Sequence, residues 1–175
     1  MKRIIAGILT AAVMTFSACS SASITGKPDI DRTFSAKASV AAGGEVISGQ
    51  LCRTADNCWT FTLNEPYALE GLTVSFCDGK TTFSMLGFEC ETDFSDSAVS
   101  ALKLFAEAYE SAVDNKDRFE NGVLEGSNEN GAFTVILDDD GSPAVINAGG
   151  FSLKLSELSE AMDTEEQSDE LILLE

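Results

Sequence analysis

Apolar and polar residues alternate along most of the chain between residues 33 and 155. A period of two predicts β-strands that bury one face and expose the other. Turn-forming pairs, among them Gly43-Gly44, Asp78-Gly79 and Asp140-Gly141, separate about ten such segments, and turns this short join antiparallel neighbours. The pattern therefore predicts a meander of strands with one apolar face and one face rich in serine and threonine.

The positions of the turns also predict which residues face each other across neighbouring strands. They place Leu51 opposite Trp59, Trp59 opposite Phe76, and Phe61 opposite Val74. A slip of one residue would move any of these side chains to the polar face. All five fall on the apolar face together, which supports the predicted meander.

Residues 97–116 depart from the alternation because their apolar side chains recur at helical spacing. The stripe consists of Val99, Leu102, Phe105, Tyr109 and Val113. We therefore expect one main helix in this part of the chain. Its apolar stripe would pack against the apolar face of the sheet.

The predicted fold class is α+β: a strongly curved antiparallel sheet, or incomplete β-barrel, with one main helix over its concave apolar face. About ten strands present on the order of 850 Å² of face, whereas one helix covers roughly 300 Å². The loop at residues 65–71, the apolar segment Leu171–Leu174 or an apolar ligand would have to cover the rest. An uncovered apolar face of this size predicts a binding site or an interface.

The candidate ligand-lining residues come from the apolar face of the strands and from the stripe of the helix. If an apolar ligand fills the concavity, these side chains would contact it. They are Phe34, Leu51, Trp59, Phe61, Val74, Phe76, Phe83, Met85, Phe88, Leu102, Phe105, Tyr109, Phe133, Ile146 and Phe151.

The N-terminus has the pattern of an export signal, with Lys2 and Arg3 followed by an apolar run at residues 4–16. A helix of this run would be about 20 Å long, too short for a hydrocarbon core of roughly 30 Å. Small residues then lead to Cys19, as in the bacterial lipobox, in which the cysteine is diacylated with palmitate-type chains. We expect a lipoprotein signal peptide at residues 1–18. Cys19 would anchor the protein to the outer face of the bacterial cell membrane, or to an outer membrane where the host has one.

We expect three segments after the signal: a tether at residues 19–30, one domain at residues 31–156 and an acidic tail at residues 157–175. The formal net charge of −18 argues against nucleic acid as a partner. The chain contains no histidine, which excludes histidine-based triads and histidine-assisted nucleophiles. We expect no cofactor and no enzymatic activity.

Part of the predicted sheet resembles a known family. The resemblance rests on Phe34, Gly49-Gln50-Leu51-Cys52-Arg53, Trp59-Thr60-Phe61, Glu65-Pro66-Tyr67-Ala68-Leu69-Glu70-Gly71-Leu72 and Asp78-Gly79, in this order. They resemble the lipoprotein-carrier (LolA/LolB-like) superfamily, and especially its anchored relatives in Gram-positive bacteria. The resemblance implies a curved sheet closed by helices around an apolar cavity, with a lipid or an acylated protein as ligand. Arg32 and Arg53 are the positional candidates for the buried arginine of the carriers.

Four further cysteines predict disulfides, because an exported protein folds in an oxidising environment. The expected registers place Cys52 opposite Cys58, and Cys58 opposite Cys77, all on the polar face. A short turn would bring the Cα atoms of Cys52 and Cys58 to about 4.5 Å, so we predict a Cys52–Cys58 disulfide. A Cys77–Cys90 bond would need a bulge or a change of register. A four-thiolate zinc site has the wrong spacing, and no metal is expected.

Two functions follow from these expectations. The first is a membrane-anchored envelope lipoprotein that binds an acyl chain, from a lipid or an acylated protein, for transport or sequestration. The second is a non-enzymatic interaction or sensor module of the same fold with a filled core. The first predicts a lipid that copurifies with the protein, and the second predicts a tight interior and a protein partner.

Overall fold

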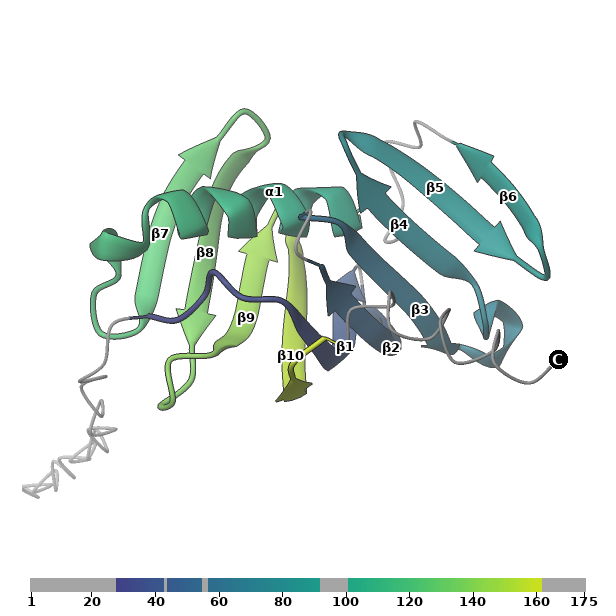
Figure 1. Ribbon diagram of the computed structural model, residues 1–175, viewed down its shortest axis with the longest axis horizontal. Helices are drawn as coiled ribbons and strands as arrows, with labels where there is room; N and C mark the ends of the chain where they lie inside the picture. Colours follow the sequence, from purple (N-terminus) through teal and green to yellow (C-terminus); the bar gives the residue numbers. More distant parts are fainter. Residues whose placement is uncertain (1–27, 43, 55–56, 92–100, 162–175) are drawn as a thin grey trace, which may run out of the picture.

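The computed structural model describes residues 28–42, 44–54, 57–91 and 101–161. In these residues ten strands form one antiparallel sheet in the order β6-β5-β4-β3-β2-β1-β10-β9-β8-β7 (Figure 1). The strands are β1 (Phe34–Ala42), β2 (Glu45–Arg53), β3 (Trp59–Glu65), β4 (Thr73–Cys77), β5 (Lys80–Met85), β6 (Phe88–Glu91), β7 (Val123–Asn128), β8 (Gly131–Leu137), β9 (Pro143–Ala148) and β10 (Phe151–Ser159). Two meanders, β1–β6 and β7–β10, join where β1 pairs with β10.

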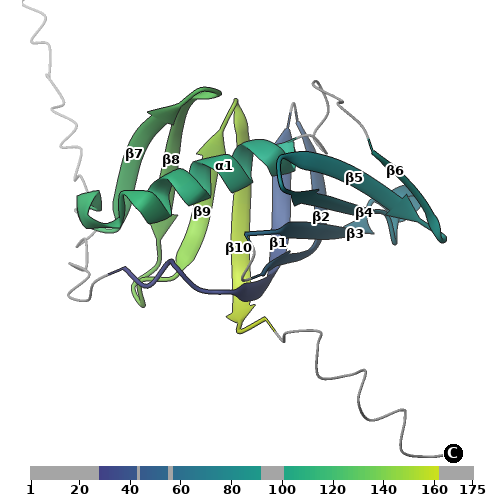
Figure 2. The same ribbon diagram turned by 45° about the horizontal axis from the view of Figure 1, so that its top comes forward.

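The helix α1 (Ala101–Asp114) lies across the concave face of the curved sheet (Figure 2). It packs against β3 and β4 of one meander and against β7, β8 and β9 of the other. β6 and β7 form the two edges of the sheet, which therefore stays open. The predicted fold class, an incomplete barrel with one main helix on its concave face, is confirmed.

The helix ends close to the predicted position, at Asp114, and residues 97–100 of the predicted helix lie outside the described residues. Two short 3-10 turns, η1 (Tyr67–Leu69) and η2 (Lys116–Arg118), complete the described helical elements. None of the helices in the described part of the chain has the length and apolarity needed to cross a membrane.

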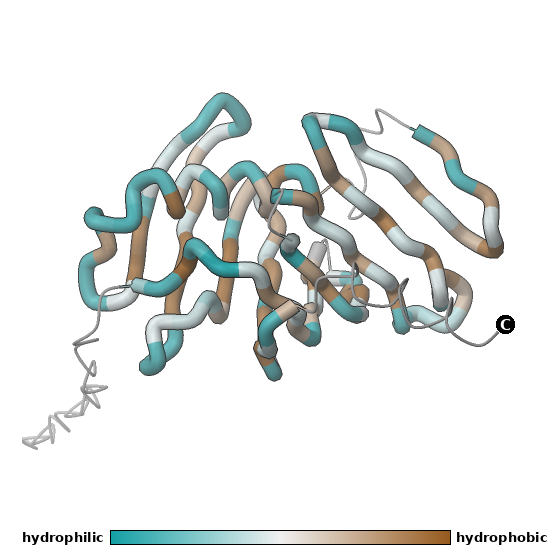
Figure 3. The backbone as a smooth tube through the Cα atoms, viewed as in Figure 1, coloured by the Kyte–Doolittle hydropathy of each residue, from teal (hydrophilic) through white to brown (hydrophobic). Residues whose placement is uncertain are grey.

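The core lies between α1 and the concave face, where the apolar residues of each strand alternate with polar ones (Figure 3). Its centre is an aromatic cluster of Phe34, Trp59 and Tyr109. The ring centroids of Phe34 and Trp59 are 5.8 Å apart, and those of Trp59 and Tyr109 are 5.2 Å apart, both with edge-to-face geometry. This geometry is the favourable one for aromatic quadrupoles. The cluster therefore joins β1, β3 and α1 in one packed unit.

The predicted registers are confirmed between β3 and β4, where Trp59 faces Phe76 and Phe61 faces Val74. The predicted register between β2 and β3 is wrong by two residues, because Leu51 faces Phe61 rather than Trp59. β2 continues to Arg53, which faces Trp59 across the hairpin. A shift of two residues leaves every side chain on the same face, so the alternation of the sequence cannot detect it.

The folded part of the chain extends beyond both ends of the expected domain. Ile30, the last residue of the predicted tether, is 0% exposed, and its carbonyl accepts a hydrogen bond of 2.8 Å from the Tyr109 hydroxyl. β10 continues to Ser159, three residues into the predicted acidic tail, and pairs there with Ser35. Both extensions adjoin β1, since Ile30 leads into this strand and the end of β10 pairs with it.

Candidate functional site: the concave face

Most of the predicted ligand-lining residues lie in the core beneath α1. Eleven of them are at most 9% exposed: Phe34, Leu51, Trp59, Phe61, Val74, Phe76, Leu102, Phe105, Tyr109, Phe133 and Ile146. Trp59, Phe105 and Tyr109 have no exposed surface and pack in the same cluster of buried residues. A ligand could reach these side chains only if α1 moved away from the sheet, and their contact with a ligand stays a prediction.

The other four predicted lining residues keep exposed surface. On the inner face of β5 and β6, Met85 faces Phe88 and Phe83 faces Cys90. Phe88 is 81% exposed and Met85 is 36% exposed, whereas Phe83 is half-buried against the core. We call Phe83, Met85, Phe88 and Cys90 the apolar ledge. It continues the concave face beyond the strands that carry the main contacts of α1.

The fourth residue, Phe151, borders a separate hollow at the opposite half of the sheet. This hollow has a volume of about 510 Å³ and lies where the ends of β8, β9 and β10 meet the turn at Gly44. Phe133 also borders it, but polar side chains such as Thr134 and Asn147 form much of its wall. The structure thus divides the predicted lining set between the core, the apolar ledge and this shallow hollow.

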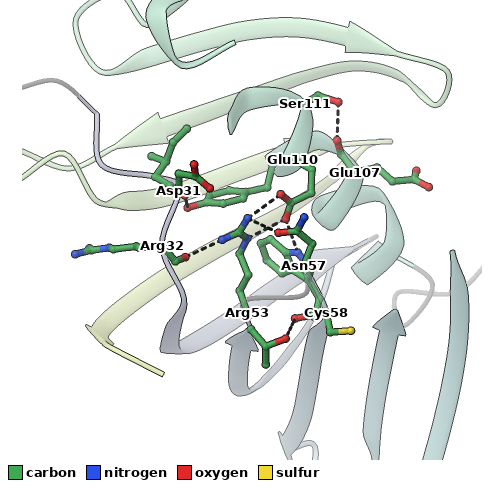
Figure 4. Close-up of polar contacts among 12 residues, drawn as sticks. Asp31, Arg32, Arg53, Asn57, Cys58, Glu107, Glu110 and Ser111 are labelled. Atoms are coloured by element: carbon green, nitrogen blue, oxygen red, sulfur yellow. Dashed lines mark hydrogen bonds and ion pairs between the residues drawn. The ribbon is translucent and has the colours of Figure 1, made fainter. Parts of the chain in front are cut away.

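A buried arginine ties the sheet to the helix at the edge of the core (Figure 4). Arg53, at the end of β2, is 3% exposed. Its guanidinium donates to both carboxylate oxygens of Glu110 on α1, at 2.9 and 2.8 Å, and to the carbonyl of Arg32 at 2.8 Å. The Trp59 indole N–H donates to the same Glu110 carboxylate at 3.0 Å. One carboxylate on the helix therefore satisfies two buried donors from two strands.

The electrostatics of this cluster follow from the Glu110 contact. Burial acts to lower the pKa of Arg53, but the hydrogen bonds and the negative charge of Glu110 outweigh it and raise the pKa above its ordinary value. Burial raises the pKa of Tyr109, whose ring lies 5.4 Å from the Arg53 guanidinium carbon. Arg53 therefore stays charged and Tyr109 stays neutral at any physiological pH.

From the sequence, Arg53 is only a positional candidate, and its partner Glu110 is not predicted. The available signal was the alternation itself, because Arg53 follows Gly49 and Leu51 on the inward-facing positions of β2. A charged residue at an inward position needs a buried partner. Arg32, the second candidate, donates a hydrogen bond of 2.5 Å to the Ser142 side chain.

A second hollow, of about 330 Å³, lies beside α1 and is lined by Phe76 together with acidic and amide side chains. Glu107 and Glu129 are two of these side chains. The pKa of Glu107 is raised, first by burial and also by the charge of Glu129, while Lys103 acts in the opposite direction. The apolar face of β4 therefore ends at an acidic margin.

The predicted Cys52–Cys58 disulfide is wrong. Cys58 is bonded to Cys77, with Cα atoms 4.5 Å apart, whereas Cys52 and Cys90 are free. The register explains the difference, because Cys52 faces Thr60 in the actual β2–β3 pairing. The alternative Cys77–Cys90 bond is wrong for the same reason, since Cys90 faces Phe83 on the opposite face of the sheet. Burial raises the pKa of the Cys52 thiol.

Comparison with known proteins gives likenesses of the fold and no family assignment. No protein-family model matches the chain. No curated protein matches it at the level of sequence. An uncharacterized conserved protein from Thermus thermophilus is 13% identical, with 78% of this chain and 83% of that chain covered and a TM-score of 0.45. A LolA superfamily protein from Nitrosomonas europaea is 8% identical, with 83% and 92% covered and a TM-score of 0.43. At these values neither likeness carries an argument about function.

Proposed function

We propose that this protein is an exported envelope lipoprotein that binds an acyl chain on the inner face of its curved sheet. Its anchor would be the lipid on Cys19, and its ligand a lipid or an acylated protein that it transports or sequesters. The observation that carries the proposal is the apolar ledge. Phe88 and Met85 extend the concave apolar face into solvent, 81% and 36% exposed, beside the closed core.

An acyl chain fits the chemistry of the ledge. Aromatic rings and a flexible methionine offer contact surface to a ligand of variable shape and give it little hydrogen bonding. Covering a phenylalanine side chain stabilises a complex by about 2 kcal/mol. The ledge also adjoins the core, because Phe83 faces the buried Val74 on β4. An acyl chain lying on the ledge would therefore reach the border of the core, and it could contact Val74 only if α1 moved away from the sheet.

The second candidate is an interaction module with a filled core. It is favoured by the complete burial of Trp59, Phe105 and Tyr109, which need no ligand to shield them from water. In this case the ledge would bind a protein surface. The two candidates differ in whether lipid contacts the ledge in the cell.

The test is photo-crosslinking with a fatty acid that carries a diazirine, in cells that express the full chain. Trypsin releases the segment between Lys80 and Lys103, which contains the whole ledge. We expect label in this segment, and a loss of roughly thirtyfold in Phe88→Ser, the factor that corresponds to about 2 kcal/mol for covering one ring. Val46→Ser is the matched control, since Val46 is an exposed apolar residue of β2, 63% exposed, and lies outside the ledge.

Two outcomes would contradict acyl-chain binding on the ledge. One is label that concentrates between Arg118 and Lys154, the segment that carries β7, β8 and β9. The other is equal labelling of wild type and Phe88→Ser. Absence of label from a folded protein would favour the interaction module.

A further inference from the structure

The strand β6 forms one edge of the sheet, and no further strand of the described residues pairs with it. All four of its residues, Phe88, Glu89, Cys90 and Glu91, are exposed. Natural edge strands are protected by short length, by charged side chains, above all lysine, by proline or by a bulge, because their unpaired backbone groups otherwise accept a further strand. β6 is short and its two charged residues are both glutamates, which repel an acidic strand but attract a basic one. It contains no lysine or proline, and it pairs with β5 without a break in register. Its backbone edge is therefore suited to strand addition.

The hairpin geometry determines which backbone groups are available. β5 and β6 are joined by a two-residue turn, at residues 86–87, in which both residues have positive φ. In such a hairpin the two flanking residues bond to each other, and the bonded positions alternate from there. Phe88 and Cys90 therefore bond to β5. The N–H and C=O groups of Glu89 and Glu91 point to the open edge.

The side chains of β6 present two different chemistries. Phe88 and Cys90 lie on the inner face as part of the apolar ledge. Glu89 and Glu91 lie on the outer face, where the ammonium of Lys80 is 3.5 Å from Glu91 and both side chains are more than half exposed. An ion pair this exposed is weak and leaves the outer face acidic. A strand added here would meet apolar contacts on one side and negative charge on the other.

The opposite edge strand, β7, does not combine an exposed apolar inner face with an acidic outer face. On β7 the inner-facing apolar residue is Leu124, which is buried, and α1 packs against that strand. The large exposed apolar residues of the described chain include Met85, Leu86 and Phe88, all in the β5–β6 hairpin, and none from β7. The two edges therefore differ in what they can bind.

The charges on β6 also select against pairing with a second copy of the chain. Side chains alternate, so any register that joins two apolar inner faces also places Glu89 and Glu91 of one copy beside the same residues of the other. Like charges at facing positions destabilise strand pairs. The formal net charge of −18 adds to this repulsion. A basic partner would instead be attracted both by Glu89 and Glu91 and by the negative net charge of the chain.

We propose that β6 binds an extended segment of a partner protein, in which apolar and basic residues alternate, as an additional antiparallel strand. Its basic side chains would lie beside Glu89 and Glu91, and its apolar side chains would lie beside Phe88 and Cys90. Main-chain hydrogen bonds would supply affinity and the alternating side chains would supply specificity. The antiparallel direction matches every pairing in the sheet. This inference goes beyond acyl-chain binding and does not depend on it.

Cys90 provides a direct readout of the proposed strand. Because its backbone bonds to β5, it would occupy a non-bonded position of the new ladder, where facing Cα atoms approach to about 4.5 Å and a disulfide can form. The probe is a short synthetic peptide of alternating lysine and valine with one central valine replaced by cysteine, activated as a mixed disulfide with thiopyridine. Attack by the Cys90 thiolate transfers the peptide and releases thiopyridone, whose absorbance is followed. The protein is the full chain with Cys52→Ser, and the modified residue is mapped by mass spectrometry.

We expect the lysine peptide to react at Cys90 roughly tenfold faster than a peptide with glutamate in place of lysine. Glu89→Lys with Glu91→Lys should reverse this preference. Glu125→Lys with Glu129→Lys is the matched control, because it changes the net charge equally near the other edge and should leave the preference intact. Methylating the lysine backbone nitrogens removes the N–H groups that face β6, so it should abolish the advantage at unchanged charge. Methylating the valine nitrogens should leave the advantage intact, because the valine N–H groups point away from β6.

Three results would overturn the inference. The first is a peptide with methylated lysine nitrogens that reacts as fast as its parent. Charge attraction without main-chain hydrogen bonds would then explain the preference for lysine. The control pair near β7 could alter the preference as much as the pair on β6. The peptides could also react alike while a photoreactive fatty acid still labels the ledge. In that last case acyl-chain binding would stand and strand addition at β6 would fall.

Discussion

Among single residues, Glu110 joins α1 to two strands of the sheet through polar contacts. Its carboxylate accepts hydrogen bonds from Arg53 at the end of β2 and from Trp59 at the start of β3. It thereby holds α1 against the sheet at a fixed position along the helix. A buried ion pair adds little stability compared with apolar packing, but it penalises any arrangement that separates its partners.

Glu110→Ala should therefore lower the free energy of unfolding by about 3 kcal/mol, because it leaves the buried Arg53 charge and the Trp59 N–H without their acceptor. The measurement is urea denaturation followed by tryptophan fluorescence, since Trp59 is the one tryptophan in the chain. Glu157→Ala removes a pair with Lys37 that is exposed on both sides, and should cost less than about 0.5 kcal/mol. Equal losses in the two variants would contradict a structural role for Glu110, the partly buried acceptor of two buried donors.

The carboxylate of Glu107, unlike that of Glu110, should destabilise the folded protein, so that the free energy of unfolding depends on pH. Its pKa is raised above the ordinary value of 4.5, mainly by burial, so the folded protein holds this proton more tightly than the unfolded chain does. The carboxylate therefore costs stability as the pH rises from 4.5 through the folded pKa. We expect Glu107→Gln to gain stability relative to wild type over this interval. Denaturation curves from acid to neutral pH test this, and a difference that does not vary with pH would contradict it.

At the scale of elements, the pattern of the sequence predicted the strands and their faces but not every register. The β3–β4 pairing was predicted because the apolar positions on both strands and the turn between them agree. The β2–β3 pairing was missed because Arg53, a polar residue, continues β2 on its apolar side. Its burial depends on Glu110, which is more than fifty residues away in the sequence. Alternation describes the faces of strands, whereas the length of a hairpin loop depends on such distant partners.

The disulfide belongs to this scale because it links β3 to β4. Removing it with Cys58→Ser and Cys77→Ser should lower the free energy of unfolding by about 3 kcal/mol, the loop-entropy value for cysteines separated by 19 residues. Cys52→Ser with Cys90→Ser is the matched control and should change stability much less. Peptide mapping without reduction gives the second check. A Cys52–Cys58 peptide in that map would contradict the pairing described here.

At the scale of the whole molecule, the comparison of areas predicted that one helix could not cover the concave face. In the structure the curved sheet brings β3 and β4 as well as β7, β8 and β9 against α1. Exposed surface of the predicted lining residues remains on the β5–β6 hairpin and, at Phe151, beside the hollow in the other half of the sheet. The division between core and ledge could not be predicted, since it depends on how strongly the sheet curves. Curvature comes from features such as the bulge at Ser48 and Gly49.

The proposed membrane anchor also concerns the whole chain. Cells grown with an alkyne analogue of palmitate should label the wild-type protein, and Cys19→Ser should lose both the label and the membrane fraction. Cys90→Ser should keep both, which makes it the matched control for loss of a cysteine. Label that persists in Cys19→Ser would contradict lipidation at this position.

The pairing of β1 with β10 gives the protein a particular order of assembly. The Ser159 hydroxyl donates to the carbonyl of Ser35, 124 residues away along the chain. Each meander can form from local hairpins, whereas closing this seam costs the entropy of a long loop. During synthesis β1 leaves the ribosome early and must wait, with one side unpaired, until β10 has been made. We expect pulse-labelled hydrogen exchange to find the amides of this seam protected last. On this expectation the centre of the finished sheet forms last, and a chain cut short before β10 would lack the pairing at the middle of the sheet rather than at its end.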